Sequence, residues 1–291
     1  MIWLVGNRGM LGTEVHHRLQ AAGLEHVATD LEVDIADRKT ISTFAESLSL
    51  TWIVNCSAYT AVDRAEDEPE AAFRINAEGV RNLAILAREK GARLLHVSTD
   101  YVFDGSKEGA YLEEDPPNPL GVYGRSKFQG ELYIRETIAE HVILRTAWLY
   151  GPGGSNFVRT MLRLFREREE VRVVADQWGS PTLAGDLADA IVQILQRETV
   201  PYGTYHYTNE GRTNWFEFAS RILESARRHR LIDREVRILP IGTDEYPTKV
   251  RRPANSYLSK EKIKRDLAIS IRSWQEALDA FVSGLAAIQL R

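Results

Sequence analysis

The chain has few of the features that would indicate an exported or membrane-bound protein. Its 291 residues include one cysteine, Cys56, so an intramolecular disulfide is impossible and a reducing compartment is expected. The apolar setting Trp52–Cys56 favours a buried strand residue over a catalytic thiol. No apolar run approaches the ~20 residues that span a bilayer, and the chain opens directly on Ile2–Val5 without room for a signal peptide. We therefore expect a cytoplasmic protein that does not bind membranes.

An excess of basic residues is also lacking. The formal net charge is -4, so neither nucleic acid nor an anionic surface is expected as a partner. An anionic ligand must then be held by local cations. Arg251 and Arg252 form a tight pair beside Pro253, and arginine forks suit a pyrophosphate, although a solvated surface pair would look the same. With 44% hydrophobic residues, the chain can bury a large core.

The first half of the chain alternates short apolar runs with longer amphipathic ones. This pattern predicts an α/β fold, a Rossmann-type parallel sheet with helices on both faces. Helical spacing also predicts one helix over Glu66–Lys90, which ends before Gly91. The five predicted strands are Ile2–Val5, His26–Thr29, Trp52–Cys56, Arg93–Ser98 and His141–Thr146.

After Thr146 prolines and glycines break the chain into shorter elements. We interpret residues 1–150 as a dinucleotide-binding domain and residues 151–291 as a smaller, mainly substrate-binding region. Because a domain need not be one contiguous segment, we expect the second part to return at least one element to the main sheet.

Three glycines, Gly6, Gly9 and Gly12, lie between the first strand and a helix that begins near Met10. Glycine permits the tight turn, the approach of the backbone to a pyrophosphate, and close helix–strand packing, with the phosphates over the helix N-terminus. A purely structural turn would carry similar residues. The context favours a dinucleotide, with Met10 and Leu11 in the turn.

Asp30 ends the second strand, where a carboxylate accepts hydrogen bonds from an adenosine ribose and favours NADH. Arg8 in the turn could instead meet a 2′-phosphate, so NADH and NADPH both stay open. Asp34 and Ile35 follow a few residues later and could meet the adenine, or Asp34 could be a plain turn carboxylate.

Tyr123 and Lys127 lie four residues apart in a helix predicted to begin after Gly121, so they share one face. Chance alone would give roughly 0.3 such pairs in this composition, so the spacing is weak evidence by itself. A lysine ammonium near a phenol is expected to lower the pKa of the tyrosine towards neutrality. Thr99, at the end of the fourth strand, is the natural third donor for a substrate carbonyl, or it simply satisfies the strand end.

Together, Gly6-x-x-Gly9-x-x-Gly12, Thr99 and Tyr123-x-x-x-Lys127 resemble the extended short-chain dehydrogenase/reductase family. Within this family the likeness is greatest to the members that reduce the C4 ketone of dTDP-4-dehydro-L-rhamnose to dTDP-L-rhamnose, using NADPH or NADH. The strings that carry it are Gly9–Gly12, Ala58–Asp63, Ser98–Gly105 and Asp176–Thr182.

The resemblance implies a role for each matched residue. Thr99, Tyr123 and Lys127 would be catalytic, and Thr99, Asp100 and Trp148 would contact the dTDP-sugar. An indole after the fifth strand suits a sugar ring, although core packing is the other interpretation. Asn76 would support the site near Lys127. The cofactor would be lined by Gly6, Gly9, Met10, Leu11, Gly12, Asp30, Asp34, Ile35, Ala58, Tyr59, Thr60, Tyr123 and Lys127.

Related dehydratases carry a glutamate directly after the aspartate that matches Asp100, whereas this chain has Tyr101. Simple reduction of a ketone is therefore expected. A nucleotide-sugar 4-epimerase uses the same pair and remains an alternative. The lineage also includes the non-catalytic β subunit of methionine adenosyltransferase, so a regulatory role is a further alternative.

Some family members hold a magnesium ion at a dimer interface, and the matching positions here are Glu14 and Asp186. Two isolated carboxylates are too few for a hard cation, so no metal is predicted. The oligomeric state is left open, with a homodimer as one option.

Overall fold

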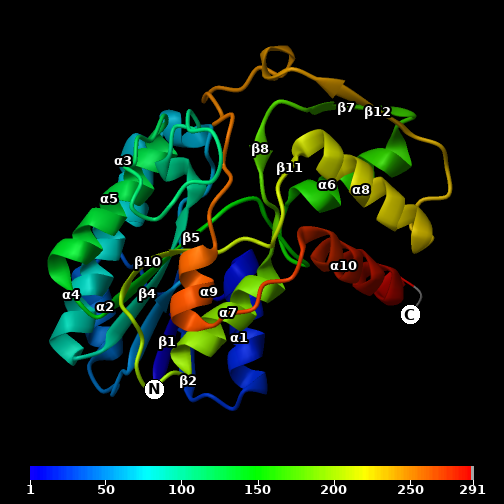
Figure 1. Ribbon diagram of the computed structural model, residues 1–291. Coiled ribbons are helices and arrows are strands. Elements are labelled where there is room, and N and C mark those ends of the chain that lie inside the picture. Colours follow the sequence, from blue (N-terminus) through cyan, green and yellow to red (C-terminus); the bar gives the residue numbers. More distant parts are fainter. Residues whose placement is uncertain (290–291) are drawn as a thin grey trace.

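A parallel sheet forms the centre of the computed structural model, which describes residues 1–289 (Figure 1). Its six strands lie in the order β10-β5-β4-β3-β1-β2, and each neighbouring pair is parallel. The predicted α/β fold class is confirmed, and the five predicted strands match to within one residue. The strands are β1 (Ile2–Val5), β2 (His26–Thr29), β3 (Trp52–Asn55), β4 (Arg93–Thr99), β5 (His141–Thr146) and β10 (Gly203–His206).

Helices cover both faces because successive side chains of a strand point to opposite sides. Ile2 and Leu4 of β1 pack against one layer of helices, whereas Trp3 and Val5 pack against the other. Figure 1 shows these layers on the two sides of the sheet. The first layer contains α1 (Met10–Ala21), α7 (Ala184–Leu195) and α9 (Glu261–Leu267), and the second contains α2 (Arg38–Ala45), α4 (Val80–Lys90) and α5 (Val122–Thr137).

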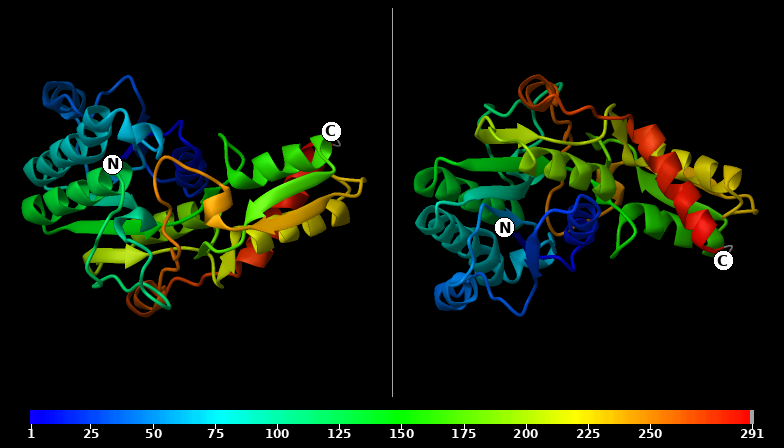
Figure 2. Two further views of the ribbon diagram at one scale, coloured as in Figure 1. Left: turned by 90° about the horizontal axis from the view of Figure 1, so that it is seen from above. Right: turned by 90° about the horizontal axis from the view of Figure 1, so that it is seen from below.

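Residues beyond 150 build both a separate layer and part of the sheet region. The separate layer has its own apolar core and extends away from the sheet to the C-terminal helix (Figure 2). Because β10, α7 and α9 return to the sheet, the structure is not divided into two contiguous parts at residue 150. The assignment of dinucleotide binding to the first part of the chain and of substrate binding to the second stays a prediction. The main elements of the separate layer are α6 (Phe157–Glu167), β7 (Glu170–Val174), α8 (Trp215–Arg228), β12 (Arg237–Ile241) and α10 (Trp274–Gln289).

Short strands connect the two parts of the molecule. They form pairs rather than a large sheet: β6 (Leu149–Tyr150) with β9 (Thr182–Leu183), and β8 (Trp178–Gly179) with β11 (Thr213–Asn214). Within residues 1–289, no helix is long and apolar enough to cross a membrane.

The helix predicted over Glu66–Lys90 ends before Gly91 as predicted, but it begins at Pro69 and is interrupted by a π turn. A 3₁₀ turn ends at Glu66, α3 (Pro69–Phe73) follows, and a π-helical turn over Arg74–Gly79 leads into α4. The π turn carries Asn76, whose side-chain amide forms two hydrogen bonds with the backbone of Tyr59. Tyr59 N donates to Asn76 Oδ1, and Asn76 Nδ2 donates to Tyr59 O. Apolar periodicity cannot reveal this change of helix type, because π turns often occur where a helix serves a local site.

Candidate functional site

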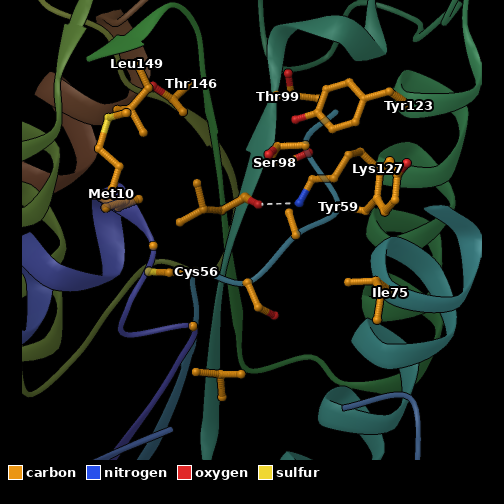
Figure 3. Close-up of a pocket in the computed structure, with 18 of the residues that line it drawn as sticks. Met10, Cys56, Tyr59, Ile75, Ser98, Thr99, Tyr123, Lys127, Thr146 and Leu149 are labelled. Atoms are coloured by element: carbon orange, nitrogen blue, oxygen red, sulfur yellow. Dashed lines mark hydrogen bonds between the residues drawn. The ribbon is translucent and has the colours of Figure 1, made fainter. Parts of the chain in front are cut away.

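A pocket of about 1000 Å³ opens at the carboxyl ends of β1, β3, β4 and β5. This is the edge at which ligands bind in open parallel sheets. Figure 3 shows Thr99, Tyr123 and Lys127 on one side of the cavity and Met10 across it. Of the residues predicted to be catalytic or to contact the cofactor or the sugar, all except Gly12 line this pocket: Gly6, Gly9, Met10, Leu11, Asp30, Asp34, Ile35, Ala58, Tyr59, Thr60, Thr99, Asp100, Tyr123, Lys127 and Trp148.

The glycine turn is built for close packing. Gly6 has a φ of 82°, and a Cβ there would lie 2.7 Å from Ser57 N. A Cβ on Gly12 would lie 1.9 Å from Gly6 O, so Gly12 sets the contact between the turn and α1 without reaching the pocket itself. Gly9, by contrast, is the N-cap of α1, and its nearest contact would be 3.4 Å. The backbone at Gly9 is therefore open to a ligand over the helix N-terminus.

These contacts predict different effects for alanine at Gly12 and for alanine at Gly9. Gly12→Ala is expected to lower the free energy of unfolding by roughly 1–3 kcal/mol, because the methyl group collides with backbone that cannot rotate away. Gly9→Ala is expected to leave stability almost unchanged and to weaken dinucleotide binding. Thermal unfolding without cofactor, followed by titration with NADPH, measures both effects. Equal unfolding temperatures for the two variants would contradict this account.

The end of β2 carries carboxylates that already have partners. Asp30 Oδ2 accepts a hydrogen bond from Arg8 N at 2.9 Å, and the guanidinium of Arg8 pairs with Glu32 at 3.2 Å. Asp34 pairs with Arg74. Arg8, which could meet a 2′-phosphate, is thus balanced by an acid, whereas Asp30 keeps lone pairs for a ribose hydroxyl. This geometry accommodates either nicotinamide dinucleotide.

Cys56 is not the buried strand residue that its apolar context suggests. It follows β3, is half-buried and lines the pocket. Burial nevertheless raises the pKa of its thiol to about 12, so the thiolate is strongly disfavoured. The interpretation that Cys56 is not a nucleophile agrees with this shift.

Tyr123 and Lys127 both face the pocket from the first turns of α5, which begins at Val122 as predicted. Lys127 is 2% exposed, and its Nζ donates to Val97 O at 2.7 Å (Figure 3). Thr99 lies beside Tyr123, and its Oγ1 accepts from Tyr101 N at 3.2 Å. Thr99 thus satisfies the strand end and also lines the pocket, so its two interpretations are compatible.

The expected lowering of the Tyr123 pKa is wrong for this structure. Burial raises the pKa of the phenol, and Asp100 and Tyr101 raise it further, while a hydrogen bond with Thr99 opposes them. Lys127 is turned towards Val97 and His96 rather than towards the phenol oxygen. Tyr123 is therefore a neutral phenol that can donate a proton.

Asp100 is a buried carboxyl group, 3% exposed, directly behind Thr99. Its Oδ1 accepts from Thr99 Oγ1 at 3.0 Å, whereas Oδ2 has no hydrogen-bond partner among residues 1–289. Burial raises the pKa of Asp100 from 3.8 to about 6. The folded protein therefore prefers the neutral acid, and ionisation costs stability as the pH rises from about 4 through 6.

Asp100→Asn should consequently stabilise the protein at high pH. The amide has no charge to bury, so its unfolding free energy at pH 8 should exceed that of the parent by up to about 3 kcal/mol. The difference should disappear near pH 4, where the carboxyl is protonated in both states. Chemical denaturation at the two pH values measures this; the same difference at both would show that ionisation is not the cause.

Trp148 has an unusual backbone for a large residue, with a φ of 49°. Its indole stacks on Trp215 of α8, with ring centroids 3.6 Å apart, and it also lines the pocket. Trp148 therefore packs against the separate layer and also lines the cavity, so core packing and a place at the pocket are compatible. The side chain is placed to offer an aromatic wall to a ligand.

Tyr101 occupies the position after Asp100 at which a dehydratase carries glutamate. Its ring packs edge-on against Tyr123, with centroids 5.5 Å apart, and the Arg252 guanidinium lies 5.9 Å from the ring centre. Arg252 also pairs with Asp63. This arginine is thus partly neutralised at the pocket edge, and neither Arg251 nor Arg252 lines the cavity.

Sequence reasoning missed the glycines that bring α5 close to the site. A Cβ on Gly124 would lie 2.2 Å from Tyr101 O, and one on Gly130 would lie 2.2 Å from Asn76 O. Glycine inside a helix was the available signal, since it costs helix stability and so indicates close packing. Asn76 Nδ2 also donates to Ser126 Oγ at 3.0 Å, beside Lys127. Asn76, for which the resemblance implies a supporting role near Lys127, therefore links the Tyr59 loop to α5.

Glu14 and Asp186, the positions matched to a family magnesium site, have arginine partners. Glu14 pairs with Arg18 at 2.7 Å, and Asp186 pairs with Arg272 at 2.6 Å. In the described part of the chain, no group of three or more histidine, cysteine or acidic side chains is arranged to hold a metal. That the protein needs no metal stays a prediction.

Comparisons with known proteins agree on one family. The model of the family described as the RmlD substrate binding domain matches residues 1–287. A dTDP-4-dehydrorhamnose reductase from Aggregatibacter actinomycetemcomitans is 41% identical, covering 94% of this chain and 96% of that protein. One from Escherichia coli K12 is 39% identical, covering 98% and 97%. The crystal structure of dTDP-4-dehydrorhamnose reductase from Bacillus anthracis in complex with NADP has a TM-score of 0.90 and 37% identity, covering 96% and 97%.

Proposed function

The chain belongs to the RmlD substrate binding domain family, and we propose that it reduces the C4 ketone of dTDP-4-dehydro-L-rhamnose to give dTDP-L-rhamnose, with NADPH or NADH as hydride donor. The observation that carries the proposal is the meeting of Thr99, Tyr123 and Lys127 with the glycine turn in one pocket. In cells the product would supply cell-surface polysaccharide synthesis.

The residues present fit a dinucleotide. The open backbone at Gly9 lies at the N-terminus of α1, and among the described residues no side chain caps that terminus. Gly9, Met10 and Leu11 would hold the pyrophosphate, and Asp30, Asp34 and Ile35 would hold the adenosine. Ala58, Tyr59 and Thr60 would line the rest of the cofactor. The bound dinucleotide supplies the hydride.

The protein's own groups would orient the ketone and move the proton. Thr99 and Tyr123 would bind the C4 oxygen, and the neutral phenol of Tyr123 would pass its proton to that oxygen as negative charge develops there. Lys127, fixed by Val97, would hold the nicotinamide ribose. Asp100, which accepts the Thr99 hydroxyl proton in the free protein, would position Thr99 until the ketone binds and that proton turns to the C4 oxygen, and Trp148 would pack on the sugar.

Tyr101 supports reduction over dehydration. Elimination of water needs a further acid and base near the ring, whereas burial raises the pKa of the Tyr101 phenol to about 12, with Asp100 adding to the effect. Tyr101 therefore cannot replace a carboxylate base at neutral pH. The epimerase alternative uses the same Tyr123 and Lys127 and differs in retaining its cofactor through the cycle.

The test is an assay of NADPH and NADH oxidation with the proposed substrate, dTDP-4-dehydro-L-rhamnose. Stoichiometric loss of reduced cofactor supports the proposal and gives the cofactor preference. Interconversion of a nucleotide sugar without net loss of cofactor would indicate an epimerase. Absence of turnover together with tight binding to a methionine adenosyltransferase would indicate a regulatory subunit.

A further inference from the structure

One of the strings that carry the family resemblance, Asp176–Thr182, lies beside Trp148 in the structure. Trp148 lies where the chain leaves the sheet, between the end of β5 and the short strand β6. The string contains β8 and β9, and β9 pairs with β6. Of the described residues that line the pocket, Trp148 is one, whereas no member of the string is. Any effect of the string on a bound ligand therefore passes through neighbours such as Trp148.

The backbone of Trp148 is held in a conformation that large residues rarely adopt. Its φ of 49° lies in the left-handed region, which persists for a bulky residue only where the surroundings enforce it. Thr182, which is fully buried, provides two such contacts. Its Oγ1 donates to Ala147 O at 2.7 Å, and its backbone N donates to Trp148 O at 3.2 Å. Thr182 thus holds the carbonyl groups before and after the Trp148 Cα, and so fixes the direction in which the indole leaves the chain.

Trp215 covers one face of this indole. The two ring centroids are 3.6 Å apart, and the ring planes differ by 13°. The string also determines where Trp215 lies, because β8 pairs with β11, with Gly179 opposite Thr213, and α8 begins at Trp215 directly after β11. Phe157 packs against Trp215 in turn, at 4.6 Å between centroids. Since one face of the half-buried Trp148 indole is covered, the other face is the one left for a ligand.

The edge of the indole meets a position where only glycine fits. A Cβ on Gly179 would lie 2.7 Å from Trp148 Cε2 and 3.1 Å from Trp148 Nε1. The φ of Gly179 is not positive, so the close approach of the ring, and not the backbone conformation, requires glycine here. A methyl group at this position must displace the indole, whose covered face is already in contact with Trp215.

We propose that three residues, Gly179, Thr182 and Trp215, are positioning residues that fix the Trp148 indole as a preformed wall for the sugar ring of the dTDP-sugar. Thr182 sets the direction of the side chain, Trp215 sets the tilt of the ring, and Gly179 sets how closely its edge approaches β8. An aromatic wall that is ordered before the ligand arrives saves the cost of ordering a side chain on binding. The string thus contributes to affinity for the sugar and takes no part in hydride or proton transfer.

This inference rests on the proposed function for the identity of the ligand. It does not rest on that function for the position of the indole, which can be observed in the protein without cofactor or substrate. Failure of the proposed function and failure of the positioning role are therefore distinguishable.

The direct test is a ¹H–¹⁵N spectrum of ligand-free protein with ¹⁵N-labelled tryptophan. The indole signal of Trp148 is assigned by its loss in Trp148→Phe. It should move in Trp215→Leu, which removes the ring current of the stacked neighbour, and in Gly179→Ala, which displaces the indole. The signal of Trp3, fully buried in the sheet, should stay in place and serves as the internal reference. An unmoved Trp148 signal in both variants would overturn the inference.

The consequence for binding is measured by calorimetric titration with dTDP-L-rhamnose and with dTDP, which lacks the sugar. Gly179→Ala and Trp215→Leu should each weaken binding of dTDP-L-rhamnose by about threefold to tenfold, the size of one aromatic contact, and leave binding of dTDP unchanged. Equal weakening of both ligands would show a general distortion of the pocket and refute the role in sugar binding. If the parent binds neither ligand, the proposed function fails, and the spectrum still tests the position of the indole.

Two control variants accompany these measurements. Trp215→Phe keeps an aromatic ring against the indole and should bind dTDP-L-rhamnose like the parent. Gly284→Ala adds a methyl group to α10 of the same layer, where a Cβ would have no neighbour within 4 Å, and should match the parent throughout.

The kinetic signature is a rise in KM without a fall in kcat. In Gly179→Ala and Trp215→Leu the KM for the keto sugar should rise by the factor seen in calorimetry, while kcat stays almost unchanged, because the lost contact serves ground state and transition state alike. If Gly179→Ala does not fold, the comparison of Trp215→Leu with Trp215→Phe carries the test. A displaced indole with unchanged affinity for dTDP-L-rhamnose would refute the proposal.

Discussion

Replacing Tyr123 by phenylalanine is expected to lower kcat for ketone reduction by about 10²–10⁴-fold, with little change in cofactor affinity. The substitution removes the proton donor but keeps the ring that packs against Tyr101. The fold should be unaffected, because the hydroxyl faces the cavity and its protein partner is Thr99. Steady-state kinetics with NADPH, beside thermal unfolding, measure both expectations.

Tyr101→Phe is the matched control. It removes a phenol from the same cluster, at a residue whose hydrogen bond is to Arg252, and should cost less than about tenfold in kcat. Comparable losses in the two variants would mean that packing, rather than proton transfer, explains the Tyr123 effect. Full activity in Tyr123→Phe would refute the mechanism.

Removing the buried carboxylate of Glu131 is expected to be the most destabilising single change near the site. Glu131 is fully buried on α5, and its two oxygens accept from Arg145 at 2.9 and 2.7 Å. Its Oε1 also accepts from Ser98 at 2.6 Å, next to Thr99. Glu131→Ala should lower the unfolding free energy by about 3–5 kcal/mol, because Arg145 is left charged and buried without its partner.

A comparison of variants separates the effect of the unpaired Arg145 charge from the effect of losing the hydrogen bonds of Glu131. Arg135 also pairs with Glu131, at 2.8 Å, but its side chain is 33% exposed, so Arg135→Ala should cost about 1 kcal/mol or less. The double variant Glu131→Leu with Arg145→Met should recover much of the stability, since it buries no charge. Urea unfolding at neutral pH measures all three. A double variant no more stable than Glu131→Ala would argue against an unpaired charge as the cause.

The ion pair between Glu131 and Arg145 also predicts how the destabilisation caused by Glu131→Ala changes with pH. Burial raises the pKa of Glu131, but the charge of Arg145 and its hydrogen bonds outweigh burial, so the net pKa is lowered. A group with a lowered pKa contributes stability above its ordinary pKa and loses it as the pH falls through the folded value. The effect of Glu131→Ala should therefore shrink in acid.

The sequence patterns predicted those helices, strands and turns whose structure is determined by their own residues and not by contacts with distant segments. Strands such as β1 and β3 are almost wholly apolar because both faces of the sheet are covered, and the ends of the five predicted strands were placed to within a residue. The turn Gly6–Gly12 and the start of α5 also have local signals. These same elements place the predicted site residues around one pocket, while the roles of Thr99, Tyr123 and Lys127 stay predictions.

What could not be predicted depends on contacts between distant segments. The π turn at Asn76 exists where one amide must bond both Tyr59 and Ser126. The pKa of Tyr123 depends on how deeply α5 sits, which Gly124 and Gly130 decide by their approach to Tyr101 and Asn76. Lys127 likewise meets His96, a residue 31 positions earlier. No periodicity within one element carries this information.

The return of α7 and β10 to the sheet limits how this protein can be re-engineered. Leu187 and Ile191 of α7 cover the same core as Val15 of α1, and Tyr205 of β10 extends it beside β5. Exchanging everything after residue 150 for the corresponding part of a relative would therefore replace more than half of the shared hydrophobic core. Transfer of sugar specificity between relatives should succeed by grafting the loops and helices of the separate layer, such as the Trp215 end of α8, and fail by joining two halves.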